Sequence, residues 1–185
     1  MKQELSTALK TLEHKGVIIY PTDTTFGLGC DATQEEACQK IIEIKGRNNH
    51  NGFIILIDDE DLLYEYVEFI PQVALDIFKY ASKPTTIIFS KGKNLAKSVL
   101  NSDGSVAIRI VKNEFCKALI RKFNRPIVST SVNISGEKHI SRIDKIPKSI
   151  SDKVDYIVPL TQELSNKPSS IIKIENDGGV KIIRE

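Results

Sequence analysis

The sequence lacks tryptophan and has few aromatic residues and few cysteines, and each shortage narrows the classes of protein to consider. Aromatic residues make up 6% of the 185 residues, which is little for a protein that stacks the bases of single-stranded nucleic acid. The three cysteines, Cys30, Cys38 and Cys116, are an odd number at wide spacing with no CxxC pair. A disulfide framework or a zinc site is therefore not expected, and we predict that these cysteines are small buried residues that catalysis does not use.

Long hydrophobic runs are absent as well. The longest uncharged apolar stretches, such as residues 52–57, are far shorter than the roughly 20 residues of a membrane-spanning helix. The amino terminus has no apolar segment typical of a signal peptide, so we expect a cytoplasmic protein without a membrane partner. No internal repeat occurs, and the 41% hydrophobic content predicts one domain over residues 1–185 with a buried core.

The formal net charge of +2 is small, but the charges are unevenly distributed along the chain. Residues 91–125 contain nine Lys or Arg against Asp103 and Glu114, whereas residues 58–68 contain six acidic residues and no base. This pattern fits a region that attracts anions, and it fits ordinary solvated helix faces equally well. The charges alone therefore assign no function.

Hydrophobic periodicity and turn residues predict helices that alternate with short strands. Gly16 is expected to close the first helix in the left-handed conformation, Thr33 and Glu36 are expected to form a capping box, and residues 21–32 are expected to be a loop. This pattern predicts a layered α/β fold with a twisted mixed sheet. Helices are expected at residues 3–15, 33–44, 59–67, 113–123, 143–152 and from Pro71 onward, and strands at 17–20, 53–57, 85–89, 105–111, 127–133, 156–158, 170–174 and 180–183.

Several familiar catalytic motifs are missing. The sequence has no GxxxxGK[ST], GxSxG or HExxH motif, and Gly27-Leu28-Gly29 lacks the third glycine of a dinucleotide fingerprint. The stretch from Tyr20 to Gly29 instead places three threonines, a carboxylate and two glycines directly after a strand, where α/β sheets usually bind ligands. Its hydroxyl and amide groups suit a polar substrate or phosphate oxygens, and the same residues also suit a purely structural turn.

Two cations follow the second predicted helix, and a third lies in the middle of a later predicted strand. If the chain is extended at Lys45-Gly46-Arg47, both cations point to one side and toward one anion; alternatively, they complement the dipole at the helix end. The alternation of residues 105–110 places Ser105 and Arg109 on the face opposite the apolar residues. An arginine in the middle of a strand needs an anionic partner, which is either a protein carboxylate or a ligand.

The stretch Ile127–Gly136 has an unusual polar pattern. If it is extended, Ser129, Ser131 and Asn133 line one face with neutral hydrogen-bonding groups and no apolar residue between them. A core strand does not normally carry such a face. The alternatives are a ligand-binding face and a solvent-exposed edge strand.

Taken together, these segments resemble the YrdC-like threonylcarbamoyl-AMP synthase family in its short, single-domain form. Their order and spacing agree with the family over nearly the whole chain, and the first and fourth segments are long and unusual. The resemblance rests on YPTDTTFGLGCDA, KGR, SVAIRI, STSVNISG and KPSSIIKI with the final IIRE.

The resemblance implies a twisted α/β sheet with a deep cationic cavity, in which ATP, bicarbonate and L-threonine become threonylcarbamoyl-AMP and pyrophosphate. Such a nucleotidyltransferase serves tRNA N6-threonylcarbamoyladenosine modification, and a downstream threonylcarbamoyl transferase uses its product. Carbamate, carboxylate and triphosphate are all anions, so fixed cations and hydroxyl groups suit this reaction better than a protein nucleophile. Mg²⁺ is expected on the ATP phosphates, without a tight metal site in the protein.

The resemblance also assigns residues to the two substrates by their positions in the motifs. Lys45 and Arg47 are the expected catalytic residues, because two cations are the hardest groups to replace in a polyanion site. Threonine-binding residues are expected at Thr24, Arg109, Ser129 and Ser169, and ATP-binding residues at Lys45, Arg47, Asn51, Ser105, Ser131, Asn133 and Arg184.

The sequence departs from the family pattern at a few positions. Asn48 and Gly52-Phe53 stand where the family often has proline and Pro-Leu, and Leu56 stands where some members have histidine. Residues 137–140 lack the usual proline and serine, and Ser170 replaces a common threonine. None of these departures removes a cation.

Two other functions fit parts of the pattern. Residues 91–125 suit weak binding of tRNA or duplex RNA by a module without catalysis, through phosphate contacts. A YciO-like protein, or a carbamoyl-adenylating domain like that of hydrogenase maturation factors, would use another amine or carbamoyl donor. The KGR and SVN segments favour the threonine branch over the YciO-like branch.

Overall fold

The computed structural model describes residues 1–46, 53–133, 140, 142–160, 164 and 167–185. The helices in these residues are α1 (Lys2–Glu13), α2 (Glu35–Lys45), α3 (Glu60–Tyr66), α4 (Gln72–Tyr80), α5 (Glu114–Phe123) and α6 (Lys148–Ser151), with 3-10 helices η1 (Lys97–Val99) and η2 (Ile143–Lys145). The strands are β1 (Ile18–Pro21), β2 (Phe26–Gly29), β3 (Ile54–Ile57), β4 (Thr85–Phe89), β5 (Val106–Ile110), β6 (Ile127–Ser131), β7 (Tyr156–Ile157), β8 (Ser170–Ile174) and β9 (Val180–Arg184).

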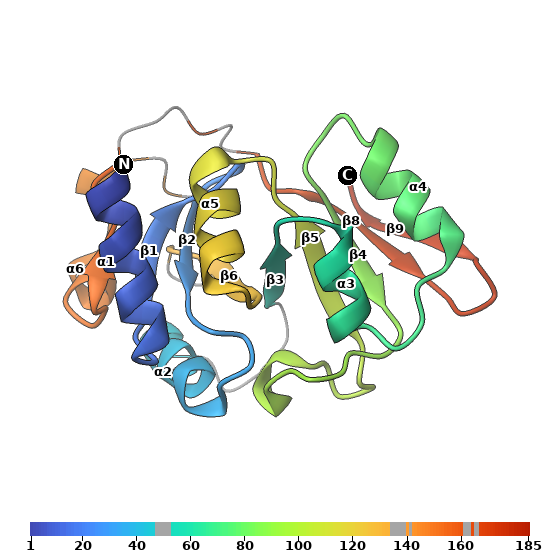
Figure 1. Ribbon diagram of the computed structural model, residues 1–185, viewed down its shortest axis with the longest axis horizontal. Helices are drawn as coiled ribbons and strands as arrows, with labels where there is room; N and C mark the ends of the chain where they lie inside the picture. Colours follow the sequence, from blue (N-terminus) through green and yellow to red (C-terminus); the bar gives the residue numbers. More distant parts are fainter. Residues whose placement is uncertain (47–52, 134–139, 141, 161–163, 165–166) are drawn as a thin grey trace.

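The strands form one mixed sheet in the order β7-β1-β2-β6-β3-β5-β4-β8-β9 (Figure 1). The pairs β1–β7, β3–β5 and β4–β8 are parallel, and the other neighbours are antiparallel. This arrangement confirms the predicted layered α/β fold with a mixed sheet. The strand β6 pairs on one side with β2 and on the other with β3, so its polar residues do not belong to an edge strand.

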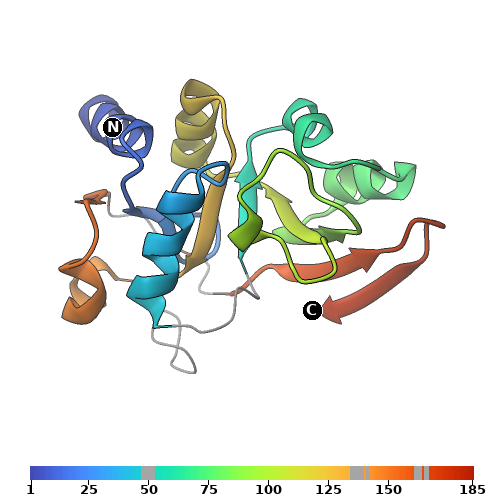
Figure 2. The ribbon, with the colours of Figure 1, turned by 90° about the horizontal axis from the view of Figure 1, so that it is seen from below.

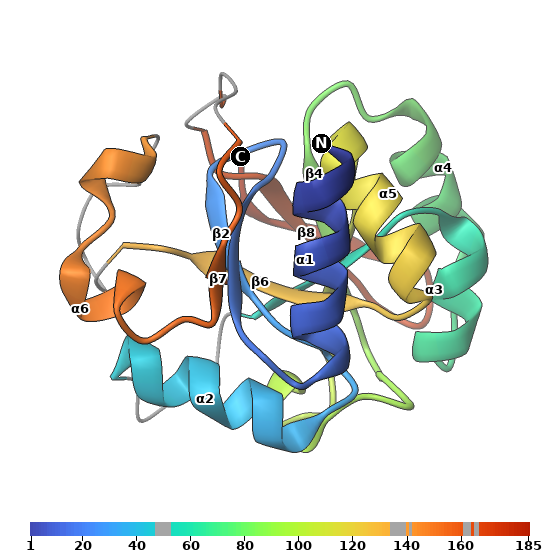
Figure 3. The same ribbon diagram turned by 60° about the vertical axis from the view of Figure 1, so that its left-hand side comes forward.

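One face of the sheet around β1, β6 and β3 is covered by α1 and α5, which lie side by side (Figure 3). Leu5, Ala8 and Leu12 of α1 recur at helical spacing and are buried. In α5 the buried residues follow the same periodicity, and the Asn113 side chain caps the helix by accepting a hydrogen bond from the Cys116 amide. These helices pack on Ile18, Tyr20, Leu56 and Ile127.

The opposite face is covered by α2, which lies across the sheet from α1 and α5 (Figure 2). Ala37, Cys38 and Ile41 of α2 join a core with strand residues such as Leu28 and Ile55. The same core continues toward α3 and α4 at the other end of the sheet (Figure 1). In the described part of the chain, no helix is long and apolar enough to cross a membrane.

The predicted loop at residues 21–32 is wrong, because β1 extends to Pro21 and β2 follows after a short turn. The capping box is also wrong. The Asp31 carboxylate accepts hydrogen bonds from both the amide and the hydroxyl of Thr33, at 2.8 and 2.7 Å. Since the Thr33 hydroxyl is engaged there, α2 begins two residues later, at Glu35, with no side-chain cap.

The predicted left-handed Gly16 is wrong by one residue. Its amide donates to the Thr11 carbonyl at 2.8 Å in a Schellman pattern, which places the left-handed conformation at Lys15, with φ 58°. Gly16 is needed for space instead, because a Cβ atom there would lie 2.6 Å from the Thr11 methyl group. Gly46 ends α2 in the left-handed conformation.

The single helix predicted at residues 143–152 is divided into η2 and α6. Pro147 separates the two elements and stands at the N-cap position of α6. A proline restricts the preceding residue to extended conformations, and Ile146 accordingly has φ −66° and ψ 127°. The apolar periodicity therefore spans two short turns.

Candidate functional site

Arg109 and Ser129 face the same side of the sheet. In the register of the strands, Leu56 of β3 lies beside Arg109 of β5, and Ile54 lies beside Ser129 of β6. Directly paired residues on neighbouring strands point to one face, and alternate residues along a strand do so as well. The strand pairing therefore brings two of the predicted threonine-binding residues to one face, with only β3 between them.

The turn between β1 and β2 adds hydroxyl groups to this face. The Thr22 hydroxyl donates to the Thr25 carbonyl at 2.7 Å and accepts from the amides of Thr24 and Thr25 at 3.2 and 3.3 Å. Because that hydroxyl has only one hydrogen, the contact of 3.0 Å between the two side-chain hydroxyls is donated by Thr24. The turn thus fixes the direction in which the Thr24 hydroxyl presents its lone pairs.

Arg109 is 3% exposed and lies against this turn. Its Nη1 donates to the Thr24 hydroxyl at 3.4 Å, and its Nη2 lies 3.8 Å from the Asp23 carboxylate. The protein therefore supplies a carboxylate near Arg109, one of the two partners that the sequence left open. The contact is longer than a direct hydrogen bond, and the buried Nε of Arg109 has no hydrogen-bond partner among the described residues. A buried guanidinium with a spare donor suits an anionic ligand.

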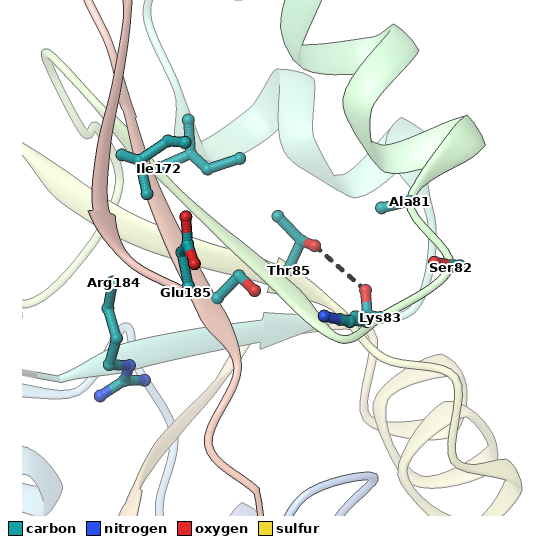
Figure 4. Close-up of a pocket in the computed structure, with 9 residues that line it drawn as sticks. Ala81, Ser82, Lys83, Thr85, Ile172, Arg184 and Glu185 are labelled. Atoms are coloured by element: carbon teal, nitrogen blue, oxygen red, sulfur yellow. Dashed lines mark hydrogen bonds between the residues drawn. The ribbon is translucent and has the colours of Figure 1, made fainter.

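Arg184 reaches the same face through a bulge in β9. Ile172 pairs with Ile182 but Ile171 pairs with Arg184, so Ile183 is an extra residue that shifts the alternation of side chains. Figure 4 shows the Arg184 side chain pointing away from Ile172. Burial, and next the positive charge of Arg109, lower the pKa of the Arg184 guanidinium. An anion near both guanidiniums would stabilise their charged forms.

Ser169 lies beside Arg184. Its backbone carbonyl accepts hydrogen bonds from Nε and Nη2 of Arg184 at 3.0 and 2.8 Å, and its hydroxyl lies 2.8 Å from that of Thr86. The hollow of about 240 Å³ in Figure 4 is on the other side of β8, where Thr85 and Ile172 line it. Arg184 is the predicted site residue that borders this hollow.

Lys45 contacts two other predicted ATP-binding residues, Ser131 and Asn133, at the end of β6. Its Nζ donates to the Ser131 carbonyl at 2.8 Å and to the Asn133 carbonyl. The amine therefore joins the end of α2 to β6, which the alternative of simple helix-dipole complementation does not require. A hollow of about 190 Å³ beside it is lined by Lys45, Asn133 and Lys153 among others.

Ser105 is buried just before β5, on the same face as Arg109 but beyond the opposite end of the strand. Its hydroxyl accepts from the Asn101 side-chain amide at 2.9 Å, and its amide donates to the Asp103 carboxylate at 3.0 Å. The side-chain hydrogen bond from Ser105 lowers the pKa of Asp103. These contacts order the turn before β5, and the structure does not place Ser105 beside Arg109.

The remaining predictions fall partly outside the described residues. Arg47 and Asn51 lie outside them, as do the departures from the family pattern at residues 48, 52 and 137–139. Leu56 lies beside Arg109 in the sheet and is fully buried in the core under α1 and α5. A histidine at that position would therefore have to enter an apolar environment.

The basic surplus of residues 91–125 is not one free surface. Four of its cations form ion pairs with acidic residues from elsewhere in the chain, one of them the buried Arg109 with Asp23. The other pairs are Lys91–Glu68 at 3.1 Å, Arg121–Asp58 at 3.3 Å and Arg125–Asp31 at 2.6 Å. Part of this charge therefore connects parts of the fold, although the Lys91 and Arg121 side chains are 64% and 70% exposed.

Sequence reasoning missed Gly27 and Tyr20, which shape the surroundings of Ser129. A Cβ atom at position 27 would lie 2.7 Å from the Ser129 hydroxyl, so only glycine leaves room for it. Tyr20 is fully buried beneath, with its hydroxyl 3.4 Å from the Val128 carbonyl. Burial raises the pKa of Tyr20, and the hydrogen bond with the Ser129 side chain opposes this shift. The signal in the sequence was the pair Gly27 and Gly29, which indicates a close approach of another side chain to this strand.

Gly27→Ala is expected to leave the protein folded and to raise the KM for the ligand that contacts Ser129 about tenfold, because the new methyl group must displace that hydroxyl. Steady-state kinetics on the purified variant measure this. Gly178→Ala is the control, since its position has φ 86° and open space around it. It should lower stability without changing KM. An unchanged KM for Gly27→Ala would contradict the placement of Ser129 in the site.

The three cysteines are free and buried, as predicted. The Sγ atoms of Cys30 and Cys38 are 3.8 Å apart, and Cys116 Sγ donates to the Pro21 carbonyl at 3.2 Å. Burial raises the pKa of both Cys30 and Cys116, so neither is a thiolate at neutral pH. Among the described residues, no group of three or more His, Cys, Asp or Glu side chains is placed to hold a metal ion.

Replacement of Cys30, Cys38 or Cys116 with alanine is expected to preserve turnover, at a cost of about 1–2 kcal/mol in the free energy of unfolding from lost packing. Chemical denaturation measures the cost, and assays below the unfolding temperature measure turnover. A folded variant without activity would show that one of these thiols takes part in the chemistry.

The chain matches a known protein family and several known proteins. The family profile Sua5–YciO–YrdC, described as Telomere recombination, matches residues 10–185. The threonylcarbamoyl-AMP synthase of Psychromonas ingrahamii is 37% identical over 137 residues, which are 72% of this chain and 72% of that protein.

Two solved structures are also similar. E. coli YciO has a TM-score of 0.87 and 26% identity, covering 100% of this chain and 90% of that chain. P. abyssi Sua5 complexed with L-threonine has a TM-score of 0.86 and 26% identity, covering 94% of this chain and 52% of that chain. The chain thus spans about half the length of the Sua5 protein. On the profile match over nearly its whole length, the chain belongs to the Sua5–YciO–YrdC family.

Proposed function

We propose that this protein is a threonylcarbamoyl-AMP synthase, a nucleotidyltransferase that converts ATP, bicarbonate and L-threonine into threonylcarbamoyl-AMP and pyrophosphate. The observation that carries the proposal is the buried Arg109 beside Thr24, in one row of the sheet with Arg184. Burial, and next the positive charge of Arg109, lower the pKa of Arg184. The relative in Psychromonas ingrahamii has this activity by name, and the Sua5 structure holds L-threonine. The proposal treats residues 1–185 as one catalytic domain.

The arrangement suits a reaction between anions. The amine of threonine and bicarbonate form a carbamate, whose oxygen attacks the α-phosphorus of ATP and displaces pyrophosphate. Carbamate, carboxylate and triphosphate repel one another, so fixed cations that hold them together lower the barrier. In this assignment Thr24, Arg109, Ser129 and Ser169 bind threonine, while the ATP side includes Lys45, Arg47, Asn51, Ser105, Ser131, Asn133 and Arg184.

ATP enters this scheme as its Mg²⁺ complex, with the ion bound by the phosphates as part of the substrate. The cysteines have no role in it, because the raised pKa values of Cys30 and Cys116 leave these thiols protonated. The product is a mixed anhydride of a carbamic acid and AMP. A separate threonylcarbamoyl transferase would pass its acyl group to tRNA.

A coupled assay tests the proposal directly. Purified protein with Mg–ATP is expected to release pyrophosphate when L-threonine and bicarbonate are both present, and not when either is omitted. Mass spectrometry of the products should detect threonylcarbamoyl-AMP. Pyrophosphate release that does not depend on threonine would refute the proposal.

A second candidate is the same type of chemistry with another amine. The observation that favours it is the structural match with YciO, which covers the whole of this chain. The assay separates the two when the other amino acids replace threonine one at a time. A clear preference for an amine other than threonine would favour the second candidate.

A further inference from the structure

Ser169 is held by Thr86, a residue that the proposed contacts with threonine do not include. The two hydroxyls are 2.8 Å apart, and Thr86 and Ser169 are 0% and 1% exposed. The backbone carbonyl of Ser169 is bound at the same time by Arg184. Ser169 is therefore fixed at its main chain by one neighbour and at its side chain by another.

Thr86 also lies between Arg109 and Arg184 in a row across the sheet. On one side it pairs with Ile171 of β8, which in turn pairs with Arg184 of β9. On the other side, Ile87 pairs with Ile108 in antiparallel register, and the next residues in this register are Thr86 and Arg109. One row across the sheet thus contains Arg109, Thr86, Ile171 and Arg184, all on the same face.

We propose that Thr86 is a positioning residue of the site, which sets the orientation of the Ser169 hydroxyl toward threonine; this inference rests on the proposed function. A serine side chain has three staggered rotamers, and a buried hydroxyl adopts the one in which it keeps a partner. Thr86 is the partner that selects the rotamer. Because the Thr86 hydroxyl lies 2.8 Å from that of Ser169, Thr86 acts on the site through Ser169.

The neighbouring Thr85 provides a matched control. It is on the same strand, is 9% exposed, and donates its hydroxyl hydrogen to the Lys83 carbonyl at 3.0 Å. Its side chain points to the opposite face, where Figure 4 shows it beside the hollow that residues 81–83 and Ile172 of β8 also line. Thr85→Val therefore removes a similar hydrogen bond from the same strand without touching Ser169.

The test compares Thr86→Val, Thr86→Ser and Thr85→Val. Thr86→Val is expected to raise the KM for threonine about tenfold while the KM for ATP stays within twofold, since the Ser169 hydroxyl loses its partner. Thr86→Ser keeps the hydroxyl and should retain a KM for threonine within about twofold of the wild type. Thr85→Val should lower the melting temperature as Thr86→Val does and leave both KM values unchanged.

A purely structural role of Thr86 predicts another result. Thr86→Val would then lower the melting temperature without a change in the KM for threonine, and that result would overturn the inference. In a Ser169→Ala background, Thr86→Val should have no further effect on this KM. If Thr86→Val does not fold, Thr86→Cys, which has a similar size and a weaker donor, should give an intermediate KM; a wild-type KM would overturn the inference.

Crystal structures keep this test separate from the test of the proposed function. If the wild type has no threonine-dependent turnover, the proposed function fails. The rotamer of Ser169 in the wild type and in Thr86→Val then decides the inference by itself. The side chain is expected to turn away from position 86 in the variant, and an unchanged rotamer would overturn the inference.

Discussion

Lys45→Ala is expected to reduce threonine-dependent pyrophosphate release by about 100-fold or more, with the protein still folded. The amine lies at the end of β6, where it binds the carbonyls of Ser131 and Asn133, and it is the described cation of the KGR segment. In the proposed reaction this positive charge offsets the repulsion between the triphosphate and the carbamate. Its loss should therefore raise the barrier to their reaction. The melting temperature should fall only modestly, because two hydrogen bonds to backbone carbonyls are lost.

Lys40→Ala is the matched control for this variant. Lys40 belongs to the same helix and its Nζ likewise donates to a backbone carbonyl, that of Lys15, at 3.1 Å. It should therefore lose stability in a similar way and retain full activity. Arg47→Ala, in the same KGR segment, is expected to lose activity as Lys45→Ala does. Near-normal pyrophosphate release by both site variants would refute their assignment.

Arg109→Met should raise the KM for threonine by about 100-fold and also destabilise the fold. The guanidinium is 3% exposed and lies 3.8 Å from the Asp23 carboxylate, so its removal leaves that buried charge without this cation. Breaking a buried pair on one side costs about 3 kcal/mol or more. Kinetics and chemical denaturation measure the two effects separately.

The double variant Arg109→Met with Asp23→Asn distinguishes binding from stability. Replacing the carboxylate with a neutral amide removes the negative charge that Arg109 faced, so most of the lost stability should return. Threonine binding should not return with it, because the guanidinium that would hold the substrate carboxylate is still absent. Recovery of activity together with stability would show that Arg109 has only a structural role.

The sequence predicted the elements where a local signal was strong. The helix at residues 113–123 has a capping Asn113 and an apolar stripe, and the strand at 85–89 has four β-branched residues before Phe89, so both were correctly placed. The predictions failed where two local signals competed with each other. Asp31 engages Thr33, and Pro147 interrupts an apolar periodicity that continues across it.

The candidate site was likewise predicted in part from the sequence and decided in part by the tertiary structure. Residue types and motif order indicated Thr24, Arg109, Ser129 and Lys45, because hydroxyls and cations in these positions have no obvious role in a core. Only the strand pairing decided that β6 is central, that a bulge turns Arg184 toward Arg109, and that Thr86 lies between them. Strand order and register depend on contacts between residues far apart in the chain, and periodicity within one segment carries no information about its neighbour in the sheet.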